Sequence, residues 1–301
     1  MMIGALVAVA VGSLIFLGLR FGIEFTGGTI VEVAYEETRP DQTVLEERLN
    51  QLELGAYSLR KADVDGYILR TRDLTEEEYS VVRDTLAVET SGLVEKRRAT
   101  IGPVIGEELK NKAFAAIGVV IALIILYVAF AFRNVREDRE DENEQDTTGV
   151  SSWIYGLVAI FVLAHDLLIP LGAFSLLGYF VGAEVDVLIV MALLTILGYS
   201  VNDTIVIFDR VRENIKKNRE EDVDEDFADT VGHSLTQTYA RSINTSLTTL
   251  AVVISLLVLG GPTTMYFALT LAVGVLAGTY SSIALAAPLL VTVERHQHKE
   301  E

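Results

Sequence analysis

The longest uncharged stretch of the sequence constrains its fold more than any other feature. Residues 242–293 form a run of 52 residues without Asp, Glu, Lys or Arg. A helix needs about 20 mostly apolar residues to cross a bilayer, so this run is too long for one span. Residues 113–132 and 167–183 are also free of charge. The chain is therefore predicted to be a polytopic α-helical membrane protein and not a soluble enzyme.

We predict six membrane-spanning helices. The third is interrupted near its middle by His165, Asp166 and Pro170, and the Gly260-Gly261-Pro262 sequence divides the long uncharged run in two. The amphipathic segment 227–239 is predicted to be a separate helix at the membrane interface. The six spans comprise residues 1–19, 113–132, 153–181, 186–208, 243–259 and 264–293.

Lys and Arg residues in the short connecting segments predict the orientation, because cytoplasmic loops are enriched in them. The connector 133–152, the connector 209–241 and the tail after residue 293 carry three, six and two, whereas the turns at 182–185 and 260–263 carry none. Both termini are therefore expected in the cytoplasm. The acidic connector 133–152 is predicted to be flexible and solvated. Residues 20–112 then form an extracytoplasmic domain after span 1–19, and residues 113–301 hold the other five spans.

The extracytoplasmic segment has the pattern of a small α+β domain. Thr75 begins a capping box with Glu78, which predicts a helix start. The pair Gly27-Gly28 is predicted to form a tight turn into the first strand. Strands are predicted at 29–35, 58–64, 67–71 and 92–101, and helices at 43–52 and after Thr75. The resulting βαββαβ order is typical of a ferredoxin-like sandwich.

The charge and cysteine content exclude several classes of protein. The chain has 42 acidic and 24 basic residues, a net charge of −18, which argues against nucleic-acid binding. The acidic excess is present in every aqueous segment, as expected of a protein adapted to high salt. Cys is absent, so disulfides and thiolate metal sites are excluded. His296 and His298 are too few for a metal site, no P-loop or nucleophile elbow is present, and we expect no cofactor and no enzymatic activity.

Ionisable residues inside spans are functional candidates, because a charge at the bilayer centre costs about 2.5–3.5 kcal/mol on insertion scales. Asp203 lies 17 residues after Asp186, roughly 25 Å along a helix, and Arg241 enters the next span from the same side. We therefore expect Asp203 and Arg241 to pair and Asp203 to carry a proton, since an Arg does not titrate. The alternative is a static pair that fixes the packing of two spans.

His165 and Asp166 are the second intramembrane candidates. Because His titrates near neutral pH, the two could relay protons toward Asp203 through water. Alternatively, His165 caps a broken helix before Pro170, or Asp166 binds a partner. Several polar residues in the spans are expected to hold helices together rather than conduct: Ser200, Asn202, Thr204, Thr245, Thr248 and Thr249. Gly274 and Gly278 form a small-residue face expected to serve packing.

Five stretches of the sequence together resemble the SecF half of the SecDF protein-export family. Each stands at the family's expected place relative to the predicted spans. They are GIEFTGGT (22–29), GPVIG (102–106), HD (165–166), GYSVNDT (198–204) leading into FDRVREN (208–214), and RSINTSLTT (241–249). The acidic loops are similar to those of haloarchaeal members.

The resemblance implies an auxiliary translocase subunit that pairs with SecD, works with the SecY channel and uses the proton motive force to assist export of unfolded polypeptides. It also implies the architecture of half a resistance-nodulation-division transporter, with Asp203 and Arg241 in the conduction path. Two alternatives stay open: a small-molecule or lipid exporter of that superfamily, and a scaffold for translocon assembly. The exporter predicts twelve spans in one chain, and the scaffold predicts inert buried charges.

Overall fold

The computed structural model describes residues 2–62, 64–87, 92–131 and 152–300. The chain divides into two compact units. The α/β unit comprises Phe21–Ala115, and the helical unit comprises Met1–Arg20 with Ala116–Glu301. This division is close to the predicted boundaries at residues 20 and 112. The predicted flexible connector 133–152 lies almost wholly outside the described residues.

The α/β unit has the predicted βαββαβ order, preceded by one short helix. Strand β1 pairs with both β3 and β4, β2 pairs with β3, and all pairs are antiparallel, which gives the order β2-β3-β1-β4. The elements are α2 (Ile23–Thr26), β1 (Gly28–Tyr35), α3 (Gln42–Leu49), β2 (Ser58–Ala62), β3 (Gly66–Thr71), α4 (Glu76–Leu86) and β4 (Leu93–Ile101).

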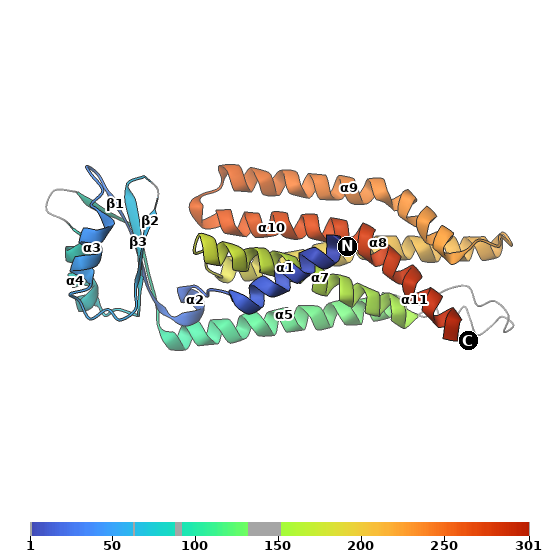
Figure 1. The fold of residues 1–301 in the computed structure, drawn as a ribbon, viewed down its shortest axis with the longest axis horizontal. Helices are drawn as coiled ribbons and strands as arrows, with labels where there is room; N and C mark the ends of the chain where they lie inside the picture. The colour runs from blue at the N-terminus through green and yellow to red at the C-terminus, as the bar shows by residue number, and fades with distance from the viewer. Residues whose placement is uncertain (1, 63, 88–91, 132–151, 301) are drawn as a thin grey trace. The chain divides into compact units, whose positions relative to one another are not determined.

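Helices α3 and α4 cover one face of this sheet (Figure 1). The alternation of β1 places Val31, Val33 and Tyr35 on the covered face, where they pack against Leu45 and Leu49 of α3 and against α4. The capping box at Thr75 and Glu78 is confirmed. Hydrogen bonds from Arg72 and from the Thr75 backbone hold the pKa of the Glu78 carboxyl at about 2. Glu78 is thus ionised at neutral pH, which suits a helix N-terminus.

The predicted turn at Gly27-Gly28 is confirmed, and it is also a close contact between distant segments. Gly27 and Gly28 have φ values of +73° and +134°, which L side chains rarely adopt. A Cβ on Gly27 would lie 2.7 Å from Pro103 Cα, and a Cβ on Gly106 would lie 2.6 Å from Gly27 N. The two glycine-containing motifs, 22–29 and 102–106, therefore pack directly on each other.

We expect Gly27→Ala to destabilise the protein by about 2–5 kcal/mol, because strain at positive φ adds to an overlap with Pro103 backbone. Gly55→Ala is the matched control, since Gly55 has φ +68° and open space around its Cβ position. The Gly55→Ala control should be destabilised only by backbone strain at positive φ, about 1–2 kcal/mol. Thermal unfolding of the purified full-length variants measures both. Equal losses in the two variants would contradict the contact.

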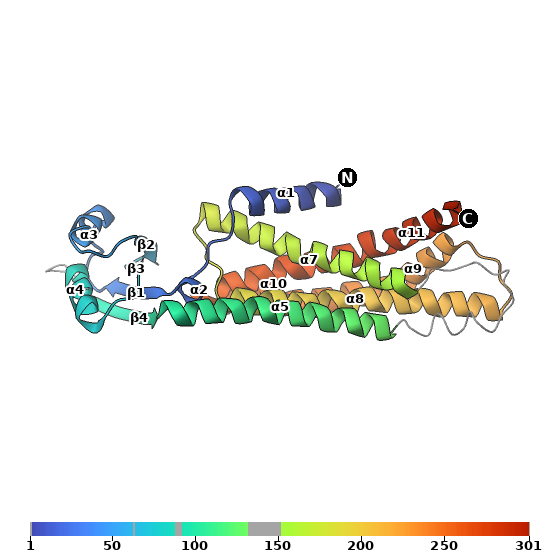
Figure 2. The ribbon, with the colours of Figure 1, turned by 90° about the horizontal axis from the view of Figure 1, so that it is seen from below.

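Among the described residues, five helices are long and apolar enough to cross a membrane, and the apolar helical segment Ile3–Phe16 is shorter. Figures 1 and 2 show α10 beside α7 and α9, and α10 contacts α7, α8 and α9. The elements are α1 (Met2–Phe16), α5 (Pro103–Ala131, which begins in the α/β unit), α7 (Ser152–Phe180), α8 (Val187–Glu220), α9 (Phe227–Leu259), α10 (Pro262–Ser281), the π-helical turn η2 (Ser282–Ala286) and α11 (Ala287–Glu300).

Two predicted interruptions are wrong. Helix α7 runs unbroken through Pro170, so His165 does not cap a broken helix. The segment 227–239 is helical but is not a separate interfacial helix, because α9 continues from Phe227 to Leu259. No Gly or Pro lies between residues 233 and 259 to end the helix. The break at Gly260-Gly261 is confirmed, since α9 ends at Leu259 and α10 begins at Pro262.

Small residues allow the helices to approach closely, as predicted for Gly274 and Gly278. A Cβ on Gly274 would lie 2.2 Å from Ile196 Cδ1, and a Cβ on Gly278 would lie 3.2 Å from Ser200 Cβ. Helix α10 therefore packs tightly on α8 at the level of Ser200. On the other side of α7, a Cβ on Gly172 would lie 2.5 Å from the Cα of Ala10 in α1.

Candidate functional site

Polar residues interrupt the buried stripe of α8 in the middle of an otherwise apolar face. The stripe repeats at three and four residues, as one face of a helix does. It comprises Ile189, Ala192, Leu193, Ile196, Leu197, Ser200, Asp203, Thr204, Ile207, Phe208 and Val211. Ser200, Asp203 and Thr204 thus face the protein interior, whereas Asn202 is exposed. The folding of α8 as an amphipathic helix is what buries Asp203.

Asp166 of α7 is completely buried and fully hydrogen-bonded. Its Oδ2 accepts hydrogen bonds from Ser200 Oγ and, at 2.8 Å, from Ser281 Oγ. Its Oδ1 lies 2.8 Å from Nδ1 of His165, the preceding residue. Three helices therefore meet at one carboxylate: α7, α8 and α10. Both oxygen atoms of Asp166 thus have partners from within the chain, and the alternative that Asp166 binds a partner subunit stays a prediction.

Asp203 is also buried, but unlike Asp166 it has a carboxylate oxygen without a hydrogen bond in the described chain. Its side chain is 4% exposed, and its Oδ2 has no hydrogen-bond partner among the described residues. Ser242 of α9 lies opposite the Asp203 carboxyl and interacts with it, but neither Ser242 Oγ nor Asp203 Oδ2 has a hydrogen bond of good geometry within the described part of the chain. His165 Nε2 is a third buried atom of this kind. Buried polar atoms normally have partners, so these three atoms mark places where water or a proton completes the bonding.

The expected ion pair between Asp203 and Arg241 is not formed within the described residues. The Arg241 charge acts on the Asp203 carboxylate through space, but the Arg241 side chain is exposed and its neighbour Ser242 is the residue that faces α8. The predicted pair rested on the depth of Asp203 and Arg241 along the bilayer. It did not take into account which side of α9 the Arg241 side chain faces. No direct hydrogen bond joins Asp203 to His165 or Asp166 in the described chain, which agrees with the expected need for water.

The polar stripe predicted on α9 does not hold described helices together. The hydroxyl groups of Thr245, Thr248 and Thr249 donate to carbonyl groups of their own helix, at 2.9–3.0 Å. Of the polar residues expected to hold helices together, Ser200 and Thr204 of α8 do so, through Asp166 and Ser282. Further contacts between helices come from hydroxyl groups that were not predicted. Tyr199 of α8 donates to Ser246 of α9 at 2.8 Å, and Ser246 pairs with Thr279 of α10 at 2.6 Å.

Residues at the start of the π-helical turn were also missed. Thr204, which follows Asp203, pairs with Ser282 Oγ at 3.0 Å, and the adjacent Ser281 is one of the donors to Asp166. Serine is common in membrane spans and usually bonds to its own helix. The sequence feature that could have indicated these residues is the Ser-Ser pair within a span. By itself this pair does not distinguish serines that bond to their own helix from serines that bond to a neighbouring helix.

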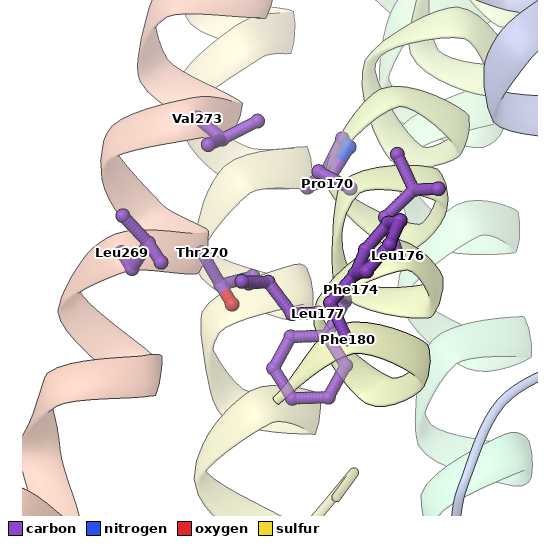
Figure 3. Close-up of a pocket in the computed structure, with 9 residues that line it drawn as sticks. Pro170, Phe174, Leu176, Leu177, Phe180, Leu269, Thr270 and Val273 are labelled. Carbon is purple, nitrogen blue, oxygen red and sulfur yellow. The ribbon is translucent and has the colours of Figure 1, made fainter. Parts of the chain in front are cut away.

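No metal site is present in the described residues, since no group of three or more His, Cys, Asp or Glu side chains is suitably placed. Figure 3 shows an apolar hollow of about 280 Å³ between α7 and α10. The Thr270 hydroxyl that lines it donates to the Tyr266 carbonyl and is not available for chemistry. The lining residues are Pro170, Ala173, Phe174, Leu176, Leu177, Phe180, Leu269, Thr270 and Val273.

Two family models match the chain. The model for the protein export membrane protein SecD/SecF, C-terminal, matches residues 82–136 and 151–296. The model for the SecD/SecF GG motif matches residues 12–38, which include Gly27 and Gly28. Together the matched ranges cover the end of the first span, the glycine turn and the whole intramembrane site described above.

Curated relatives and solved structures agree with the family models. The protein translocase subunit SecF of Sebaldella termitidis is 35% identical over 282 residues, covering 92% of this chain and 83% of that protein. SecF of Vibrio alginolyticus is 36% identical over 299 residues, covering 94% and 83%. The crystal structure of SecDF from Thermus thermophilus, a translocon-associated membrane protein, matches with a TM-score of 0.80 and 32% identity over 98% of this chain. This chain spans 37% of that longer protein.

Proposed function

The chain belongs to the SecD/SecF family of protein-export membrane proteins, and on that premise we propose that it is the SecF-type half of an accessory complex of the protein translocase, with a SecD-type subunit as the other half. Its relatives are named protein translocase subunits, and one relative is a SecDF chain of which this chain matches 37%. The role is auxiliary and non-enzymatic. The matching family describes membrane proteins of protein export.

The proposed mechanism is transfer of protons through Asp203. The observation that carries it is a buried carboxylate oxygen without a partner inside a membrane-spanning helix. An ionised group in that position is costly, whereas a protonated one is not, so the site alternates between two states of different energy. A membrane potential of about 100 mV supplies about 2.3 kcal/mol per charge. That is enough to bias a movement of the protein that helps an unfolded polypeptide across the membrane.

Arg241, His165 and Asp166 have supporting roles in this proposal. Arg241 is exposed on α9 and attracts the Asp203 carboxylate through space, and as an Arg it does not titrate itself. His165 keeps one unpartnered ring nitrogen that can exchange a proton with water. Asp166 is held by three hydrogen-bonding groups and acts as a fixed carboxylate.

The proposed topology has six spans, with α1 as the first although it is shorter than the other five. The distribution of Lys and Arg supports cytoplasmic termini and an extracytoplasmic α/β unit. The antiparallel order β2-β3-β1-β4 supports a ferredoxin-like sandwich for that unit. The exposed apolar surfaces of α5 and α9 fit lipid and a second membrane subunit.

The experiment that tests the assignment is copurification of a tagged full-length chain from native membranes, followed by mass spectrometry. We expect a SecD-type subunit to copurify in an amount similar to the chain itself, with components of the SecY channel in smaller amounts. A tagged, unrelated multi-pass protein from the same membranes is the control. Recovery of the chain without any SecD-type subunit would contradict the proposed half-complex, and recovery of a transporter for small molecules would favour the exporter.

A further inference from the structure

The last membrane-spanning segment contains one turn of π-helix. The turn η2 comprises Ser282–Ala286, has the sequence SIALA and separates α10 from α11. The turn itself holds neither Gly nor Pro, but Pro288 follows it by two residues and cannot donate a hydrogen bond to the carbonyl of Ala284 inside the turn, which favours an irregular turn at this place. Single π-helical turns within α-helices are rare and occur frequently at functional sites, because they alter the direction in which neighbouring side chains point.

Two successive hydroxyl groups at the start of this turn reach two different helices. Ser281 Oγ donates to Asp166 of α7 at 2.8 Å, and Ser282 Oγ pairs with Thr204 of α8 at 3.0 Å. Both serine side chains are completely buried. Successive residues of a helix point about 100° apart. The two serine side chains can therefore bond to α7 and α8 at the same time because both helices pack against this turn.

The same contacts enclose Asp203 from both directions along α8. Ser200, one turn before Asp203, donates to the carboxylate oxygen of Asp166 that Ser281 also bonds. Thr204, one residue after Asp203, is the partner of Ser282. Among the described residues, Asp203 Oδ2 has no hydrogen bond of good geometry and Ser242 of α9 is the side chain opposite it, so the residues beside Asp203 on α8 largely set the position of this carboxylate.

We propose that Ser281 and Ser282 are positioning residues for proton transfer at Asp203, and that the π-helical turn aligns them. This inference rests on the proposed function. Loss of the Ser281 hydroxyl releases Asp166 from α10, and loss of the Ser282 hydroxyl releases Thr204 of α8 from the π-helical turn, so each loss removes one contact that fixes the surroundings of Asp203. The titratable group in direct contact with Asp166 is His165 on α7. The hydroxyl groups that reach Asp166 from α8 and α10 do not titrate in the physiological range.

The test uses the full complex with its SecD-type partner in proteoliposomes, and it measures proton-gradient-dependent proton uptake and export. We expect Ser281→Ala and Ser282→Ala each to lower proton uptake by about five- to thirtyfold, the effect of losing one or two hydrogen bonds. Ser281→Thr and Ser282→Thr keep the hydroxyl and should recover uptake to within about threefold of the parent, a loss of less than one hydrogen bond. Thr292→Ala is the matched control, because its exposed hydroxyl bonds only to the Pro288 carbonyl of its own helix.

Alanine variants that are as active as the parent, or threonine variants that are as inactive as the alanine variants, would overturn the inference. Ser282→Ala is the variant expected to fold like the parent, because it removes only the hydrogen bond between two neutral hydroxyl groups and leaves the three bonds to Asp166 intact. Asp203→Asn is measured in parallel to separate the two hypotheses. If Asp203→Asn is inactive and both alanine variants are active, only this inference fails. If Asp203→Asn is active, the proposed function fails and this inference fails with it.

Discussion

Asp203→Asn is expected to abolish the gradient-dependent part of export while the protein stays folded and bound to its partner. An amide resembles a protonated carboxyl in size and polarity but cannot release a proton at any physiological pH. The lost driving force is about 2.3 kcal/mol per charge at about 100 mV, which corresponds to roughly a fortyfold bias between two states. Because Asp203 Oδ2 has no hydrogen-bond partner among the residues that the structure describes, the substitution breaks no described bond at that atom.

Export into membrane vesicles, with and without a protonophore, measures the effect. The parent should lose its gradient-dependent export when the protonophore is added, whereas Asp203→Asn should be unaffected by it. Asn202→Ala is the matched control, since Asn202 is the exposed neighbour on the same helix. Gradient-dependent export by Asp203→Asn equal to that of the parent would favour the scaffold. Export that depends on a Na⁺ gradient instead would assign a different coupling ion.

Asp166→Ala is expected to have the largest effect on stability. Asp166 is completely buried and accepts hydrogen bonds from two other helices and from His165. Its removal leaves three buried polar groups without their partner, and breaking a buried network of this kind costs about 3–5 kcal/mol. We therefore expect a lower unfolding temperature of the purified protein and less protein in the membrane.

Asp166→Asn provides the matched control for this prediction. It keeps the volume of the side chain and one acceptor oxygen, so it should lose less stability than Asp166→Ala. Asp203→Ala should also destabilise the protein less than Asp166→Ala, because in the described part of the chain no hydrogen bond to Asp203 Oδ2 is lost. Two assays thus distinguish the two aspartates. Substitution of Asp166 should mainly lower stability, whereas substitution of Asp203 should mainly lower gradient-dependent export. An unfolding temperature of Asp166→Ala equal to that of the parent would contradict the network.

The sequence predicted the elements that depend on local patterns. The bilayer requires long uncharged runs, so five long spans could be read directly, and Gly260-Gly261 located the break between α9 and α10. The alternating strands and the capping box at Thr75 predicted the βαββαβ order. The continuity of α7 through Pro170 was missed, because neighbouring helices in a membrane protein stabilise a helix that contains proline.

The candidate site was predicted only in part, because its contacts depend on rotation about each helix axis. The free-energy cost of a charge inside the bilayer identified Asp203 and Asp166 as candidates within the spans. In the structure both side chains are buried. Depth along the membrane suggested that Arg241 pairs with Asp203, but Ser242 is the residue of α9 that faces inward. Neither Ser281 nor Ser282 was foreseen, since the π-helical turn has no known sequence signature and serines are common in spans.

The central claim is that Asp203 binds and releases a proton inside the membrane. Infrared difference spectroscopy of the complex in lipid, recorded as the pH is changed, detects the carbonyl stretch of a protonated carboxyl group. We predict a band that appears as the pH falls, that is absent from Asp203→Asn and that persists in Asp166→Asn. A spectrum in which no protonated-carboxyl band depends on residue 203 at any pH would contradict the account.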